Sequence, residues 1–321
     1  TISNKFLRQG LGQRPKVLKG DETMNQVTVF FEGLGLPRMT WNKTAFTLFG
    51  KIDFPWAALV LLAGIIAGTV FACRRGKKRE RISGDDLFEV VLCGLLGSRL
   101  LYMIDSFGAF RKLSWAPELK LWGSVVLAVL FVVLICRFLR VRVEKAADVL
   151  APAILLGLCI GAFYGLLDGN ADSAWMRETS EFSLFGKTLA LPSGEGTPWW
   201  LFRMGIYPNN VSDIYMVFVH PLFLYAAVWS LVGFVGLNLF ARHKAFDGQV
   251  FLLGLIWFAL GLIFVTGLST APQAGEVQWV AAIAAILALI RLIVLGVAYR
   301  QARKRFEAGL LIIVRGDSAV Q

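Results

Sequence analysis

One stretch of the sequence, FVHPLFLYA at 218–226, places two reactive side chains inside an otherwise apolar run. His220, one of only two histidines in the chain, lies five residues before Tyr225. An imidazole can act as a general base near neutral pH, or it can make a structural hydrogen bond. The structural role is the more common one, because no Ser, Cys or second carboxylate stands at a spacing that implies a triad. Pro221 lacks an amide hydrogen, so we expect it to kink or start a helix and to place His220 near the outer surface.

A second stretch, LLGSRLLYMI at 95–104, carries Arg99 with Tyr102 three residues later on the same helical face. A charge within a membrane span is costly, which makes it a functional hypothesis by default. A guanidinium can hold a lipid phosphate through two parallel hydrogen bonds, or it can reach outward to water along its aliphatic stem. Both interpretations remain open for Arg99, whereas Arg291 near the inner end of the last apolar run favours contact with water.

A third stretch, GLCIGAFYGLLDGNAD at 157–172, ends in polar residues. Its glycines at 157, 161 and 165 are four residues apart and predict a flat helical face for close packing. Asp168 and Asn170 then mark the outer end of that helix.

Metal and cofactor motifs are not visible in the sequence. The four cysteines lie in or at the ends of apolar runs, and none pairs with another at metal-ligand spacing. There is no phosphate-binding loop, no dinucleotide fingerprint after a strand and no HExxH. We therefore expect no metal and no cofactor.

The elements that must position these residues are apolar runs long enough to cross a bilayer. The chain has 321 residues, of which 56% are hydrophobic and 17% charged. Backbone amides need internal partners in lipid, so such runs must be helices. The sequence predicts an all-α polytopic membrane protein with about seven spans: 54–73, 86–104, 121–139, 147–167, 213–240, 248–267 and 278–298.

The net charge of +11 gathers beside alternate spans, which excludes a nucleic-acid-binding surface as its explanation. Basic residues follow the first, third, fifth and seventh runs, at 74–81, 137–145, 242–244 and 300–305. This pattern predicts an outside amino terminus and a cytoplasmic carboxyl terminus. The basic residues of the amino-terminal tail conflict with it, and Met24 or Met39 is a possible start. No cleavable signal peptide is visible.

Short extramembrane elements flank the spans. FTLFGKIDF at 46–54 and FSLFGKTLAL at 182–191 both alternate apolar and polar residues around a Gly-Lys pair, which predicts two hairpins. We expect an extracytoplasmic tail at 1–45, a membrane domain at 46–299 with a cap of hairpins and loops at 168–212, and a basic cytoplasmic tail at 300–321.

Five segments together resemble the prolipoprotein diacylglyceryl transferase family over about residues 46–300. FTLFGKIDFPW resembles the family's opening hairpin, and DVLAPAILLGLCIGAF resembles the segment leading into its signature. GSRLLY resembles its Gly-Gly-Arg-x-x-Tyr, HPLFLY its His-Pro-x-x-Leu-Tyr, and DGQVFLLGLIWFALG its sixth span. The resemblance implies a seven-span enzyme of the bacterial inner membrane, which moves diacylglycerol from phosphatidylglycerol to a lipoprotein cysteine.

The departures from the family pattern are concentrated where that chemistry takes place. The signature Gly-Arg-x-Gly-Asn-Phe-x-Asn-x-Glu aligns with GAFYGLLDGN. Across the chain the replacements are Ala162 and Gly261 for arginines, Gly165 and Asp168 for asparagines, Asn170 and Ala226 for glutamates, Trp122 for a histidine and Ala57 for a tyrosine. A departing phosphate needs preorganised positive charge, and losing one such donor typically costs about 10²–10³ in rate.

These replacements predict a non-catalytic protein with the transferase fold, which serves as a lipid-binding or structural subunit of a membrane complex. We expect Ala162, Gly165, Trp122 and Gly261 to line the central cavity, where the active site of the family would lie. The expected partners are other membrane proteins and a phospholipid similar to phosphatidylglycerol. The residues expected to bind this lipid are Arg99, Tyr102, Tyr164, Asp168, His220 and Tyr225. The alternative is a divergent active transferase in which Arg99 holds the phosphate and His220 acts as base. A transporter or channel has less support, because there is no inverted repeat and few intramembrane carboxylates.

Overall fold

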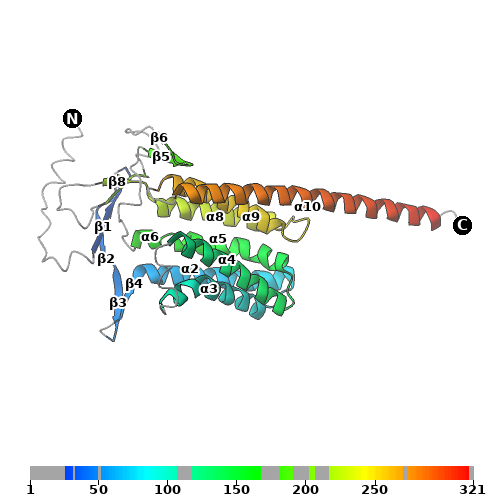
Figure 1. Ribbon diagram of the computed structural model, residues 1–321, viewed down its shortest axis with the longest axis horizontal. Helices are drawn as coiled ribbons and strands as arrows, with labels where there is room; N and C mark the ends of the chain where they lie inside the picture. Colours follow the sequence, from blue (N-terminus) through cyan, green and yellow to red (C-terminus); the bar gives the residue numbers. More distant parts are fainter. Residues whose placement is uncertain are drawn as a thin grey trace, which may run out of the picture.

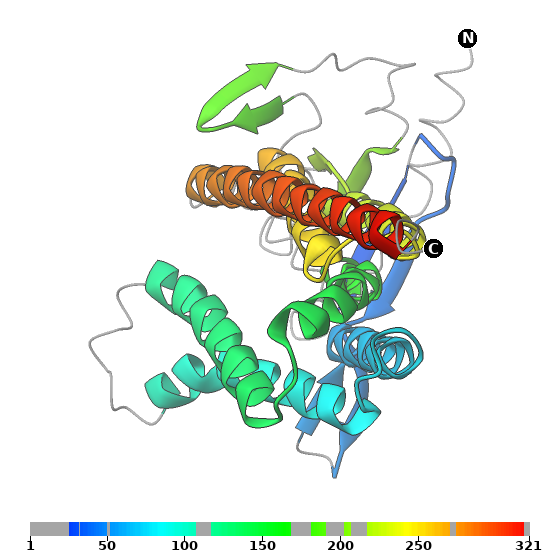
Figure 2. The ribbon, with the colours of Figure 1, turned by 90° about the vertical axis from the view of Figure 1, so that its right-hand side faces the viewer.

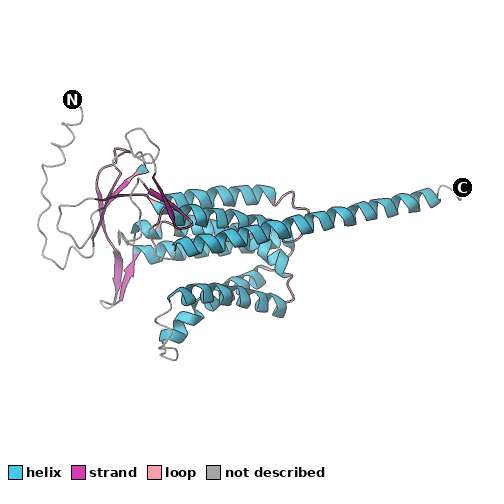
Figure 3. Ribbon diagram, turned by 45° about the horizontal axis from the view of Figure 1, so that its top comes forward, coloured by secondary structure: helices cyan, strands magenta, loops and turns pink. Residues whose placement is uncertain are grey.

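The computed structural model describes most of the chain after residue 25, and the helices occupy most of the described part. The described residues are 26–31, 33–49, 52–106, 117–167, 181–190, 202–206, 217–269 and 274–317. Strands gather at one end of a set of long helices that run side by side (Figures 1 and 3).

Seven helices in this part of the chain have 19 residues or more: α2 (Trp56–Arg75), α3 (Gly84–Ser106), α4 (Pro117–Phe138), α5 (Val143–Gly161), α8 (Leu222–Phe240), α9 (Gln249–Gly267) and α10 (Ala274–Asp317). Two short helices, η2 (Gly76–Glu80) and α6 (Tyr164–Leu167), follow α2 and α5. The strands are β1 (Gln26–Phe30), β2 (Met39–Asn42), β3 (Thr44–Leu48), β4 (Ile52–Pro55), β5 (Glu181–Leu184), β6 (Lys187–Ala190), β7 (Met204–Ile206) and β8 (Val217–Val219).

Five of the helices are long and apolar enough to cross a membrane: those that contain α2, α5, α8, α9 and α10. In α4 the apolar stretch among the residues described in full is shorter, at Gly123–Phe138. The predicted polytopic helical fold is therefore confirmed, and five of the seven predicted spans correspond to helices that meet this criterion.

The fifth span begins later than its predicted start at 213. Residues 217–219 form strand β8 instead, and Pro221 stands directly before α8. An apolar run of this kind does not distinguish a short strand from the beginning of a helix. The last helix continues past 298, where its span was predicted to end: α10 runs to Asp317 as one rod that extends beyond the other helices (Figure 1).

The bundle is organised around α5, which contacts α2 on one side and α8 and α9 on the other (Figure 2). Small residues allow α2 and α5 to approach closely. A Cβ at Gly64 would lie 2.6 Å from the carbonyl oxygen of Gly157, and one at Gly68 would lie 2.9 Å from that of Ala153. The predicted flat face of α5 is thus used at Gly157 to pack against α2.

A four-stranded antiparallel sheet with the order β2-β1-β7-β8 joins distant parts of the chain. Three of its apolar side chains, Val29, Met204 and Val219, pack with Phe31 directly after β1 and with Phe223 at the start of α8. Pairing across some 175 residues leaves no local sequence signal, so the sequence did not predict this sheet. It fixes the point at which α8 begins.

Both predicted hairpins are present. β3 pairs with β4 directly before α2, and β5 pairs with β6 around a turn at Phe185 and Gly186. Gly186 has a φ of 84°, a conformation that glycine adopts without strain.

The second hairpin is attached to the helices through Gln278 of α10, whose side chain is 1% exposed. Its amide nitrogen donates to the carbonyl oxygens of Ser183 (2.9 Å) and Ile263 (3.2 Å), and its oxygen accepts from the Phe185 amide at 2.6 Å. One buried amide therefore joins β5, α9 and α10.

Candidate functional site

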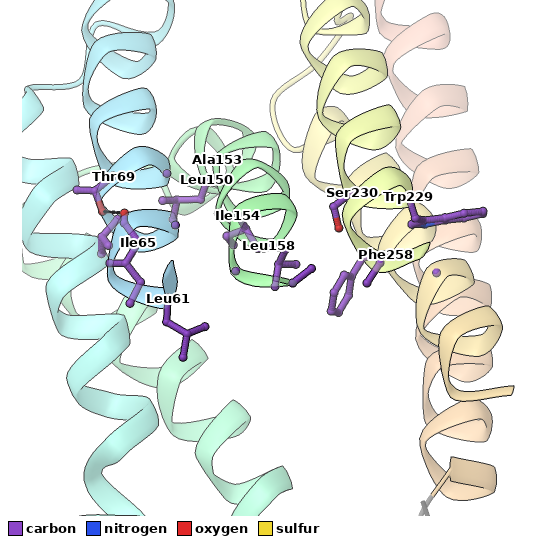
Figure 4. Close-up of a pocket in the computed structure, with 18 of the residues that line it drawn as sticks. Leu61, Ile65, Thr69, Leu150, Ala153, Ile154, Leu158, Trp229, Ser230 and Phe258 are labelled. Atoms are coloured by element: carbon purple, nitrogen blue, oxygen red, sulfur yellow. Dashed lines mark hydrogen bonds between the residues drawn. The ribbon is translucent and has the colours of Figure 1, made fainter. Parts of the chain in front are cut away.

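A cavity of about 570 Å³ lies among α2, α3, α5, α8 and α9. Leu61, Ile65 and Thr69 of α2 lie on one side of it, Leu150 to Leu158 of α5 form the middle, and Trp229, Ser230 and Phe258 lie opposite (Figure 4). None of the described residues that line it is charged. The cavity therefore has the chemistry of a site for hydrocarbon rather than for a headgroup.

The polar groups at the wall are largely used within the protein. The Thr69 hydroxyl donates to the carbonyl oxygen of Ile65 at 2.7 Å. The Trp229 indole nitrogen donates to the Trp257 carbonyl oxygen, and the Trp257 indole nitrogen donates to the Trp229 carbonyl oxygen, both at 3.0 Å. The two indole rings also stack, with centroids 4.5 Å apart and planes 21° apart.

The stacked indoles occupy the space beside Gly261. A Cβ added at Gly261 would overlap the pyrrole edge of Trp229, with Cε2 only 3.2 Å away. The resemblance described above predicts that Gly261 stands in place of an arginine, and the Trp229 ring lies where a side chain at residue 261 would have to begin. Trp229 was not identified from the sequence, because a tryptophan in a span is also expected simply to pack against lipid.

Two of the four residues expected to line the cavity do so. Ala162 and Gly261 are in its wall, together with Ala226. Gly165 is not in the wall, and a Cβ there would face Phe223 at 3.8 Å. The side chain of Trp122 lies outside the described residues.

His220 and Tyr225 lie close together at the junction between the sheet and α8. The His220 side chain is completely buried, and its ring centroid is 6.1 Å from that of Tyr225. Tyr225 lies a further 6.1 Å from the ring of Phe264 in α9. Burial lowers the pKa of the His220 imidazole to about 4, although a hydrogen bond with the Glu181 backbone acts in the opposite direction. The neutral, buried imidazole connects the end of β8 to Glu181 in the cap, and it does not line the cavity.

The other predicted lipid contacts lie elsewhere or outside the described residues. Arg99 is exposed on α3 and is not in the cavity wall. Tyr164 is 36% exposed in α6, and the Tyr102 side chain and Asp168 are outside the described residues. The structure thus brings His220 and Tyr225 together, whereas Arg99 lies on another helix, α3.

A network of ionic groups at the end of the bundle opposite the strands was not predicted. Lys244, in the α8–α9 loop, contacts Glu80 of η2, Asp148 of α5 at 3.3 Å and Asp247 at 3.4 Å. We call these four residues the Lys244 network. Burial alone lowers the pKa of the Lys244 ammonium, but the hydrogen bonds and charges of Glu80 and Asp148 outweigh it and raise this pKa above its usual value.

Asp148, 2% exposed, also caps α9. Its two carboxylate oxygens accept from the amides of Gly248 and Phe251, each at 2.9 Å. Arg75 of α2 additionally donates to Asn238 of α8. These contacts connect the helices on both sides of the cavity. The signal that the sequence offered for this network was an aspartate, Asp148, at the start of a predicted span.

Comparison with known proteins agrees with this architecture. A family model described as prolipoprotein diacylglyceryl transferase matches residues 43–299. Among similar proteins, all named phosphatidylglycerol–prolipoprotein diacylglyceryl transferase, that of Listeria innocua is 26% identical over 69% of this chain and 76% of its own. That of Pediococcus pentosaceus is 27% identical over 71% and 80%, and that of Cutibacterium acnes 30% identical over 72% and 75%.

Proposed function

The chain belongs to the prolipoprotein diacylglyceryl transferase family, and from that premise we propose that it keeps the family's membrane-embedded fold without a catalytic centre. It would act as a lipid-binding or structural subunit of a membrane complex. The observation that carries this proposal is the uncharged wall of the cavity, with Trp229 packed against Gly261.

The chemistry explains why an uncharged wall matters. Transfer of diacylglycerol from phosphatidylglycerol requires the anionic phosphate to be held and the departing glycerol phosphate to be stabilised. Both steps depend on preorganised positive charge in a site from which water is excluded. At the two aligned positions this chain has Ala162 and Gly261, and Trp229 excludes a longer side chain from the second.

The retained ligand would be a phospholipid whose acyl chains fill the apolar cavity. Hydrocarbon contact favours such a ligand by about 25 cal/mol for each Å² removed from water, and no charged group in the described wall selects a headgroup. Selection of a headgroup would then come from residues outside the described wall, and the lipid contacts predicted from the sequence are Arg99, Tyr102, Tyr164, Asp168, His220 and Tyr225.

The arrangement in the membrane is also part of the proposal. The strands of the cap would lie outside, with the Lys244 network and the basic residues after α10 on the cytoplasmic side, as the distribution of Lys and Arg favours. The membrane domain would span 46–299, with the tail at 1–45 outside and the basic segment 300–321 inside.

The decisive assay incubates the purified chain with phosphatidylglycerol and a lipobox peptide, and measures diacylglycerol attached to the cysteine thiol. We expect no attachment above a reaction without protein. A relative from the family serves as positive control under identical conditions. Turnover that Arg99→Ala and His220→Ala each abolish would establish the alternative, an active transferase with those two residues as phosphate ligand and base.

The complex is tested separately. Affinity purification of the tagged chain from its native membrane in mild detergent should recover another membrane protein in stoichiometric amount. Recovery of the free monomer alone would contradict the subunit role, whatever the outcome of the activity assay.

A further inference from the structure

A second groove lies on the outside of the bundle between α2 and α3. Its volume is about 460 Å³, and its wall consists of Ile65, Ile66, Thr69, Val70, Cys73 and Arg74 of α2 with Phe88, Val91, Leu92 and Leu95 of α3. Phe88 and Ile66 are 54% and 53% exposed, so the apolar side chains of the groove face the surroundings of the protein. This surface would lie against lipid.

One end of the groove carries positive charge. Arg74 is the only charged side chain among the described residues of the wall, it is exposed, and it forms no ion pair with any described residue. Lys77 and Lys78 are exposed directly after it on η2. Segment 74–89 holds six basic and four acidic residues, and one of the acidic residues, Glu80, is already paired with Lys244. The headgroup end therefore favours an anion.

The polar atoms deeper in the groove are satisfied. The Cys73 thiol donates to the Gly84 carbonyl oxygen at 3.3 Å, and the Thr69 hydroxyl donates to that of Ile65. From Arg74 to Ile65 the groove follows α2 for nine residues, or about 14 Å at 1.5 Å per residue. It thus offers one cation and then a purely apolar path, which matches a phosphate followed by an acyl chain.

The groove is separate from the cap in position but joins the central cavity. It lies toward the end of α2 that is opposite β4 and β8 (Figure 1). Four of its residues, Ile65, Thr69, Val91 and Leu95, also line the central cavity. An acyl chain in the groove would therefore reach the cavity wall.

We propose that this α2–α3 groove binds one anionic phospholipid from the leaflet at whose surface Arg74 lies. The Arg74 guanidinium donates charge-assisted hydrogen bonds to the phosphate, and one acyl chain follows the groove toward Ile65. The headgroup end of this site is separate from the central cavity, and the proposal does not depend on whether the protein is catalytic.

Native mass spectrometry of the full chain in detergent tests the proposal, with phosphatidylglycerol and phosphatidylcholine of identical acyl chains as ligands. Arg74→Gln removes the charge, and Val70→Trp fills the groove at a residue that the central cavity does not share. Arg79→Gln and Val126→Trp are matched controls, because both residues are exposed and neither lines the groove. Ala162→Trp, in the wall of the central cavity, removes any lipid bound there.

We expect phosphatidylglycerol to bind more tightly than phosphatidylcholine to the Ala162→Trp protein. Arg74→Gln should weaken phosphatidylglycerol about tenfold, which corresponds to about 1.4 kcal/mol, and Val70→Trp should weaken both lipids. The two controls should match the parent. Equal affinity for the two lipids, or an Arg74→Gln protein that behaves like Arg79→Gln, would overturn the proposal. So would complete loss of lipid in the Ala162→Trp protein.

Discussion

Substitution of Gly261 by alanine tests whether the Trp229 indole really occupies the position of the missing arginine. A Cβ at Gly261 would overlap the pyrrole edge of Trp229. The indole is not free to move away, because it stacks on Trp257 and donates a 3.0 Å hydrogen bond to the Trp257 carbonyl oxygen. The added methyl group therefore has to displace a fixed ring.

The expected magnitude follows from two opposing effects. Replacing a glycine within a helix by alanine stabilises by about 0.5–1 kcal/mol, whereas forcing an extra group into a packed site costs about 1–3 kcal/mol. Gly261→Ala should therefore lower the free energy of unfolding by about 1–2 kcal/mol. In a Trp229→Ala background the obstacle is gone, so the same change should raise it by about 0.5–1 kcal/mol.

The measurement is SDS denaturation from detergent micelles, followed by helical circular dichroism so that loss of a tryptophan does not alter the signal. All four proteins of the cycle are compared, and the coupling between the two positions should be about 2 kcal/mol. Gly236→Ala in α8 is the matched control, since a Cβ there would have no atom within 4 Å. It should be neutral or slightly stabilising in both backgrounds.

Two results would refute the reasoning. Gly261→Ala could behave like Gly236→Ala in the parent protein, or the effects of Gly261→Ala and Trp229→Ala could simply add. In either event the space beside Gly261 would be open, and an arginine there would be sterically possible.

Three further predictions concern the residues that hold the fold around the cavity. His220 has a pKa of about 4 in the folded protein against about 6.5 unfolded. Its contribution to the free energy of unfolding is therefore present above about pH 6.5 and is lost as the pH falls toward 4. The denaturation midpoint should fall over this range, and His220→Gln should make the midpoint depend less on pH. Asp148→Ala removes two capping hydrogen bonds of α9 and a partner of Lys244, and should lower the free energy of unfolding by about 3–5 kcal/mol in the same assay. Asp247→Asn is the control: Asp247 is partly exposed, so this change should lower it by at most about 1 kcal/mol. Gln278→Leu should increase amide hydrogen exchange in 181–190 at least about tenfold, because it leaves buried backbone groups of the hairpin unpaired; unchanged exchange would show that other contacts hold the hairpin.

The sequence predicted the elements whose signal is local. Length and apolarity identified the helices, and the repeated Phe-Gly-Lys turns identified both hairpins. Replacement of charged residues in the family pattern located Ala162 and Gly261 in the cavity wall. Each of these inferences depends only on residues close together in the chain or on a matched motif.

The features that the sequence did not predict depend on contacts between distant residues. β1 pairs with β7, which lies far from it in the sequence, and Lys244 meets Glu80 and Asp148 from two other segments. The pairing of Trp229 with Trp257 has the same origin, because neither residue signals its partner. The predicted start of the fifth span at 213 was wrong since β8 is as apolar as the helix that follows it.

The length of α10 has a mechanical consequence. Its 44 residues would measure about 66 Å as a helix, roughly twice the thickness of the hydrocarbon core. Arg300, Arg303, Lys304 and Arg305 mark where such a rod would leave the lipid. Beyond that point the helix is a stiff spacer, which would hold a partner bound near residue 317 at a fixed distance from the bilayer. Because Gln278 connects the other end of the helix to the β5–β6 hairpin, the spacer would rotate together with that hairpin.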